Sequence, residues 1–232
     1  MNLGLIQLFS FLLLAPQIDS PSDTGDRNAV IKVLENGKVL CQETTRIKKD
    51  NGLTTIKTDY TFNQDVFASK VYSYQNNLEK ADYQLYNKAT GHKESVSFKD
   101  GIYVLNYQES SNDKEKTAEL KVKAPAVYDE GLVLFVQNNL SKLKAGEKLE
   151  MSIIVPERLD YFRFVASLVD QDDEQLYLEV VPDNFILRQV VKPVKLSFDK
   201  KSGRLVELTG LSKMSHKKIA LTEVLISYKS KD

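Results

Sequence analysis

Few side chains in this sequence have the type and spacing that catalysis or metal binding requires. The chain has two histidines, His92 and His216, each in a polar, turn-like segment with no neighbouring carboxylate to orient the ring. A histidine base needs such a partner, so we expect both rings to be solvated. The one cysteine, Cys41, has no adjacent basic residue to lower its pKa, so we expect a small buried hydrophobic residue. The alternative is a reactive thiol or an intermolecular disulfide.

The acidic run at residues 170–174 (DQDDE) could hold a cation, because carboxylate oxygens bind hard metal ions. It lacks the central glycine and the distal glutamate of a calcium loop, and strand-like segments flank it, so we predict an exposed hairpin turn. The sequence contains no P-loop, no G-x-S-x-G elbow, no dinucleotide-binding glycine motif and no H-E-x-x-H motif. We therefore predict a protein that is not an enzyme, with no catalytic residues, no metal and no cofactor.

The charge of the chain argues against nucleic acid as a partner. The 232 residues include 32 basic and 32 acidic side chains, which gives a formal net charge of zero. Proteins that bind nucleic acid usually carry a basic excess on one face, whereas here the two signs are interspersed. We expect no nucleic-acid partner.

The N-terminus has the pattern of an export signal. An apolar run at residues 3–15 is followed by a polar, turn-rich segment. A membrane span needs about 20 apolar residues, whereas this run has the length of a signal-peptide core. With Ser20 and Ser22 at the small-residue positions, we predict a signal peptide over residues 1–22 and a periplasmic or secreted mature chain without a stable transmembrane span. Because no basic residue precedes the run, an uncleaved anchor and a buried N-terminal helix stay open as alternatives.

The body of the chain, residues 23–232, has the pattern of consecutive antiparallel strands. Apolar and polar residues alternate with a period of two over residues 56–62, 117–124 and 149–155. Such alternation is typical of strands with one buried and one wet face, as in an antiparallel sheet. We predict a single, mainly β domain: one curled antiparallel sheet, open or a half-barrel, made of consecutive hairpins.

Turn residues support the hairpins. Asn-Gly or Asp-Gly pairs occur between strand-like runs at residues 36–37, 51–52 and 100–101. These pairs are strong hairpin signals, because both central residues of a type I′ turn have positive φ. Residues 199–203 (DKKSG) predict a longer hairpin loop that ends on a glycine.

One segment departs from the period of two. Residues 129–146 place apolar side chains at helical spacing, with acidic residues at the start and lysines at the end, the order that the helix dipole favours. Gly146 would end the helix. We predict one amphipathic helix at about residues 130–145, packed on the concave face of the sheet.

The aromatic residues suggest where a ligand could bind. Eleven tyrosines and ten phenylalanines crowd the strands, where they either fill the core or line an apolar cavity between sheet and helix. Arg158 beside Asp160 could orient an anionic head group at its mouth; the alternative is a solvated turn over residues 156–160. The residues predicted to bind a ligand are Leu132, Phe135, Val136, Leu140, Arg158 and Tyr161.

Two segments carry a family resemblance. Residues 135–164 (FVQNNLSKLKAGEKLEMSIIVPERLDYFRF) resemble part of uncharacterised exported proteins of Gram-negative bacteria, and residues 192–208 (KPVKLSFDKKSGRLVEL) resemble a closing hairpin of such domains. More loosely, a curled sheet with a helix on its concave side is similar to the periplasmic lipoprotein carriers, a likeness of architecture alone. Neither resemblance assigns functional residues.

These features together predict a non-enzymatic, exported cell-envelope protein that binds a lipid or another apolar small molecule between sheet and helix. The alternative is an interaction or structural module that binds another envelope protein. A hydrolase is the less favoured third possibility, because no nucleophile setting is recognisable.

Overall fold

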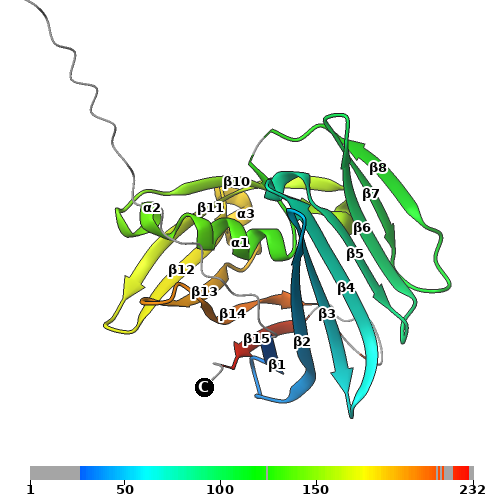
Figure 1. Cartoon of the computed structure of the whole chain (residues 1–232), viewed down its shortest axis with the longest axis horizontal. Helices are drawn as coiled ribbons and strands as arrows, with labels where there is room; N and C mark the ends of the chain where they lie inside the picture. The colour runs from blue at the N-terminus through cyan, green and yellow to red at the C-terminus, as the bar shows by residue number, and fades with distance from the viewer. Residues whose placement is uncertain (1–26, 124, 213, 215, 217–221, 230–232) are drawn as a thin grey trace, which may run out of the picture.

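The computed structural model describes residues 27–229 apart from residues 124, 213, 215 and 217–221; the predicted signal peptide lies outside them. In this part of the chain the strands form one curled sheet, and helix α1 lies between the two halves of the curve (Figure 1). None of the helices described is long and apolar enough to cross a membrane.

The strands of the first half are β1 (Arg27–Val33), β2 (Val39–Asp50), β3 (Leu53–Phe62), β4 (Asp65–Gln75), β5 (Asp82–Asn87), β6 (His92–Lys99), β7 (Ile102–Gln108) and β8 (Lys116–Leu120). Those of the second half are β9 (Ala126–Val127), β10 (Leu149–Val155), β11 (Asp160–Gln171), β12 (Gln175–Pro182), β13 (Val194–Asp199), β14 (Leu205–Ser212) and β15 (Thr222–Tyr228). The helices are α1 (Glu130–Asn138), α2 (Leu140–Lys144), α3 (Phe185–Val190) and the single 3₁₀ turns η1 (Leu78–Lys80) and η2 (Pro156–Arg158).

The first and last strands meet in the middle of the sheet. The order is β8-β7-β6-β5-β4-β3-β2-β1-β15-β14-β13-β12-β11-β10-β9, so strands that follow each other in the sequence are neighbours within each half. The halves join through the antiparallel pair β1–β15, with Ala29 opposite Tyr228 and Val33 opposite Val224. The outer strands β8 and β9 do not pair with each other, so the sheet curls without closing. The predicted fold class is confirmed.

Two of the three predicted Asn-Gly or Asp-Gly turns have both residues at positive φ, whereas at Asn36-Gly37 only Gly37 does, with φ of 67°. Asn51 and Gly52, with φ of 47° and 80°, join β2 to β3, and Asp100 and Gly101, with φ of 53° and 83°, join β6 to β7. A further turn between β3 and β4 has the same handedness without a glycine, with Asn63 and Gln64 at φ of 50° and 69°. Because glutamine is unusual at positive φ, the sequence did not indicate this turn.

The predicted strand over residues 117–124 is too long. β8 ends at Leu120, which pairs with Tyr103 near the start of β7. Residues 121–123 are not in a strand, although the same register would leave Ile102 of β7 opposite residue 121.

The predicted helix over residues 130–145 is present, but it is divided. α1 and α2 meet at Asn139, whose φ of −115° and ψ of 17° are not helical. The helix ends before Gly146, at φ 87°, as predicted. The short helix α3 was not predicted; Asn184 caps it by accepting hydrogen bonds from the backbone N–H groups of Ile186 and Leu187.

Two apolar cores fill the two halves of the sheet. Val133, Val136, Leu140 and Leu143 of α1 and α2 pack on the second half, among Leu178, Leu196 and Phe198, so the helix does lie on the sheet. In the first half, Tyr72 and Tyr128 are fully buried among the side chains of β2 to β7.

One glycine lets these two cores meet closely. A Cβ at Gly131, in the first turn of α1, would lie 2.3 Å from the hydroxyl oxygen of Tyr72. That hydroxyl donates a hydrogen bond to the carbonyl of Leu78 at 3.1 Å and cannot easily move away. Glycine at this position therefore lets the start of α1 rest against the first half of the sheet.

Candidate ligand-binding cavity

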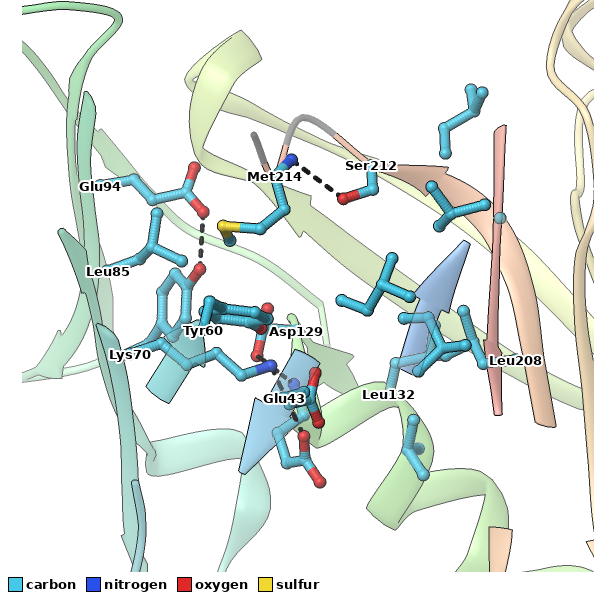
Figure 2. A pocket seen from close by; sticks show the side chains of 18 of the residues that line it. Glu43, Tyr60, Lys70, Leu85, Glu94, Asp129, Leu132, Leu208, Ser212 and Met214 are labelled. Carbon is cyan, nitrogen blue, oxygen red and sulfur yellow. Dashed lines mark hydrogen bonds and ion pairs between the residues drawn. The ribbon is translucent and has the colours of Figure 1, made fainter. Parts of the chain in front are cut away.

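A cavity of about 370 Å³ lies where the two halves of the sheet and the start of α1 face each other. Its lining residues come from both halves, including β1 to β7 and β13 to β15, and from α1. Figure 2 shows Glu43, Lys70 and Asp129 together on one side of this pocket, with Leu132 and Leu208 facing them. The pocket therefore has a polar wall and an apolar wall.

The strand register of the first half builds much of the polar wall. Lys70 on β4 lies opposite Leu85 on β5, Leu85 lies opposite Glu94 on β6, and Glu94 lies opposite Tyr107 on β7. In a neighbouring row on the same face of the sheet, Glu43 on β2 lies opposite Tyr60 on β3. Residues directly opposite in an antiparallel pair share a face of the sheet, so these side chains all point into the curve.

Buried ion pairs connect this wall to helix α1. The Lys70 Nζ lies 2.8 Å from Asp129 Oδ1 and 3.7 Å from Glu130 Oε2, and Arg27 Nη2 donates to Glu130 Oε1 at 2.7 Å. Burial alone would raise the pKa of Glu130, but Arg27 and Lys70 hold it below its ordinary value. Burial alone would lower the pKa of Lys70, but Asp129 and its neighbours hold it well above the ordinary value. The cluster therefore keeps its charges although it is buried.

Asp129 holds an unusual backbone conformation at the start of α1. Its φ of 44° and ψ of −123° lie in a region that a residue with a side chain rarely adopts. Its carboxylate accepts from the backbone N–H of Glu130 at 2.8 Å and pairs with Lys70. The carboxylates of Asp129, the N-cap of α1, and of Glu130, its first residue, therefore both lie next to Lys70.

Glu43 accepts one side-chain hydrogen bond from the described residues. The residue is 4% exposed, and Thr45 Oγ1 donates to Glu43 Oε1 at 3.2 Å. In the described part of the chain, no group donates a hydrogen bond to the other oxygen, Oε2, and Figure 2 shows the side chain at the pocket. Burial raises the pKa of Glu43, which Lys70 opposes and nearby Glu130 reinforces.

A second polar group lies on β5 and β6. The Tyr83 hydroxyl donates to Glu94 Oε1 at 2.6 Å, and His92 Nε2 lies 3.7 Å from Glu94 Oε2. The expectation that His92 is solvated and lacks a carboxylate is wrong, because its residue is 7% exposed and β6 points it into the curve beside Glu94. His216 is also not free in solvent: it is half-buried and stacks on Phe62 with 3.6 Å between ring centroids.

The structure does not bring the predicted ligand-binding residues together. Leu132 lines the cavity, whereas Phe135, Val136 and Leu140 pack in the core of the second half. Arg158 is exposed on η2, in the solvated turn that was the alternative, and Tyr161 packs half-buried against the first core.

The polar residues of the cavity were missed by sequence reasoning, although they leave a signal. Glu43 falls at the buried parity of its strand, between Cys41 and Thr45, and Lys70 falls at the buried parity between Ala68 and Tyr72. A charged residue at a buried position of an alternating strand is unusual. That pattern alone does not show which charges meet.

Two other expectations concern candidate chemistry outside the cavity. Cys41 is buried, and burial raises the pKa of its thiol to about 12, so it is the small buried hydrophobic residue predicted. The acidic run forms the predicted exposed turn between β11 and β12, where Asp172 accepts hydrogen bonds from the backbone N–H groups of Glu174 and Gln175. The Asp172 carboxylate therefore stabilises the turn.

Comparisons with known proteins give little further identification. No family model matches the chain, and no curated protein matches it. Among solved structures, the chain is similar to a beta-barrel-like protein of domain of unknown function DUF1849 from Brucella abortus. The similarity has a TM-score of 0.46 and 9% sequence identity, and it covers 89% of this chain and 96% of that chain.

Proposed function

We propose that this protein is a non-enzymatic binding protein that holds a small, largely apolar molecule with one polar end between the two halves of its sheet. The observation that carries this proposal is the two-sided lining of the cavity. Its volume of about 370 Å³ falls in the range of small-molecule sites, which are mostly apolar with a few polar groups that fix orientation.

The apolar wall supports a ligand with a hydrocarbon body. Leu132 and Val133 of α1, Leu208 of β14 and Val224 of β15 all line the cavity. Apolar surface removed from water contributes about 25 cal/mol per Å², so such a wall favours an alkyl or aryl group over water.

The chemistry of the polar wall supports binding without catalysis. Arg27 and Lys70 neutralise Glu130 and Asp129 in ion pairs, which orient groups but leave no free base among them. The Cys41 thiol, whose pKa burial raises to about 12, is not a nucleophile near neutral pH.

We propose that the protein is localised in the cell envelope, in the periplasm or outside the cell. The support is the sequence of residues 3–15, which has the length of a signal-peptide core and precedes small residues suited to cleavage. A carrier or sensor of an apolar molecule is useful there, because such molecules dissolve poorly in the aqueous space.

A cavity-filling variant tests the binding function. A Cβ at Gly210 would meet only ordinary contacts, at 3.7 Å from Leu208 and Val194, and all three residues line the cavity. Gly210→Leu should therefore extend into the cavity without strain. The control is Thr209→Leu, which adds a similar side chain to the opposite face of β14.

The measurement is calorimetric titration with decanol, an uncharged ten-carbon probe kept below its solubility limit. We expect about one decanol per chain in the wild type and in Thr209→Leu, and at least a tenfold weaker affinity in Gly210→Leu. No binding to the wild type, or equal binding to Gly210→Leu, would contradict the proposal.

A second candidate is an interaction module for another envelope protein. Phe185 and Ile186 on α3 are adjacent and 73% and 72% exposed, and exposed apolar pairs of this kind occur at protein contacts. A stoichiometric partner that co-purifies with the wild type and is lost in Phe185→Ser would favour this function.

A further inference from the structure

The charges around the cavity do not balance. Three carboxylates, Glu43, Asp129 and Glu130, lie together with two cations, Arg27 and Lys70. Arg27 and Lys70 form ion pairs with Asp129 and Glu130, at distances of 2.7 to 3.7 Å between nitrogen and oxygen. The group is therefore one positive charge short when all three carboxylates are ionised, and Glu43 is the one without an ion pair of its own.

The open oxygen of Glu43 points to where that charge would come from. Glu43 is only 4% exposed, yet Oε2 receives no hydrogen bond from any described group. Glu43 Oε2 is not among the fully buried side-chain atoms without a partner in the described residues, so it is open to the cavity, where a ligand, water or proton can satisfy it. Because Glu43 lines the cavity, a ligand there can reach this oxygen.

The side chains beside Glu43 suit a cation. Tyr60 lies directly opposite it on β3, and tyrosine rings attract ammonium groups through their faces. Lys70 already uses the Tyr60 ring in this way, with its nitrogen 5.9 Å from the ring centroid. Elsewhere on the polar wall, Glu94 adds a further carboxylate to the lining.

We propose that the ligand carries a single positive charge, an ammonium group on an apolar body, and that this group pairs with Glu43 Oε2. This inference deepens the proposed function and rests on it. A carboxylate or phosphate head group would instead add negative charge to a cluster whose carboxylates outnumber its cations.

Binding of a cation should release a proton. The ionisable groups around Glu43 are Arg27, Cys41, Tyr60, Lys70, Glu130 and Tyr228. Burial raises the pKa of Glu43, so its carboxyl group holds a proton more readily in the empty protein than in water. An ammonium group takes the place of that proton, so affinity for it should rise as the pH rises through the range in which Glu43 titrates.

The experiment compares three ten-carbon probes by calorimetric titration of the full mature chain: decylammonium, decanol and decanoate. An alkylammonium resembles the lysine side chain, with a pKa near 10.4, so decylammonium stays charged from pH 5 to 8. At pH 7.5 we expect decylammonium to bind at least tenfold more tightly than decanoate. We also expect its affinity to rise between pH 5 and 8, and its apparent enthalpy to depend on the buffer in the sense of proton release.

Glu43→Gln tests the residue, because glutamine keeps the oxygen that Thr45 contacts and removes the charge. This variant should bind decylammonium at least tenfold more weakly, keep its affinity for decanol and lose the proton release. The control is Glu150→Gln, an exposed carboxylate on β10 that pairs with Arg163 and should leave all three affinities unchanged.

Each other outcome has a definite meaning. Decanoate binding as tightly as decylammonium, or Glu43→Gln binding decylammonium like the wild type, would overturn the inference and leave the proposed function standing. A larger loss in Glu94→Gln than in Glu43→Gln would also overturn it, because the cation would then pair with Glu94. Failure of all three probes to bind would instead reject the proposed function itself.

Discussion

Lys70→Met should destabilise the protein strongly, because it removes a cation from a buried cluster and keeps the length of the side chain. Lys70 is 8% exposed and its nitrogen contacts Asp129 and Glu130 at 2.8 and 3.7 Å. Removing one partner of a buried ion pair typically costs about 3–5 kcal/mol. Arg27 still pairs with Glu130, and Asp129 still caps α1, so we expect the lower end, about 3 kcal/mol.

The loss should shrink at low pH. Arg27 and Lys70 hold the pKa of Glu130 below its ordinary value, so its contribution to stability is present above the unfolded-state pKa and is lost as the pH falls. The variant has less of this contribution to lose. The unfolding free energies of wild type and Lys70→Met should therefore differ most near pH 7.5 and converge as the pH falls below 4.5, the ordinary pKa of a glutamate.

Urea unfolding followed by tyrosine fluorescence and far-ultraviolet circular dichroism measures this, since the chain has eleven tyrosines and no tryptophan. The control is Lys195→Met on β13, an exposed lysine 3.7 Å from Glu179, where the cost should stay below about 1 kcal/mol. A cost for Lys70→Met no larger than that of Lys195→Met would refute the buried cluster as a structural unit.

Three further results are expected. Leu140→Ala, in the core under α2, should cost about 2–5 kcal/mol in urea unfolding without changing decanol affinity, whereas a near-neutral cost with altered affinity would make the helix a movable lid. Burial raises the pKa of Glu43, so the contribution of this residue to stability falls as the pH rises through that pKa. Glu43→Gln should therefore gain stability relative to the wild type from pH 5 to 8. Equal pH profiles of the two proteins in thermal unfolding would contradict this. Intact-mass measurement on protein from its native host should show a chain that begins near Asp23, and a full-length mass in the cytoplasmic fraction would rule out export.

Much of the fold could be predicted because the information was local. The period of two in β5, where exposed and buried residues alternate without exception, and the positive φ of Asn51-Gly52 are properties of neighbouring residues. The division of the helix at Asn139 was less visible, since Asn139 fits the helical spacing of the apolar residues around it.

The cavity could not be predicted because it depends on contacts between distant residues. Lys70 and Asp129 are 59 positions apart, and Arg27 and Glu130 are 103 positions apart. Their meeting follows from the pairing of β1 with β15 and from the placement of α1 between the halves, neither of which the alternating pattern specifies. The ligand-binding prediction centred on the helix stripe for this reason, although most of that stripe packs in the second core.

Organic extraction of the protein purified from its native host, followed by mass spectrometry, tests the central claim most directly. The account predicts one small molecule per chain with an apolar body, present in the wild type and in Thr209→Leu and absent from Gly210→Leu. An extract of the wild type that contains no such molecule, from protein that also fails to take up decanol, would contradict the claim that this cavity binds a ligand.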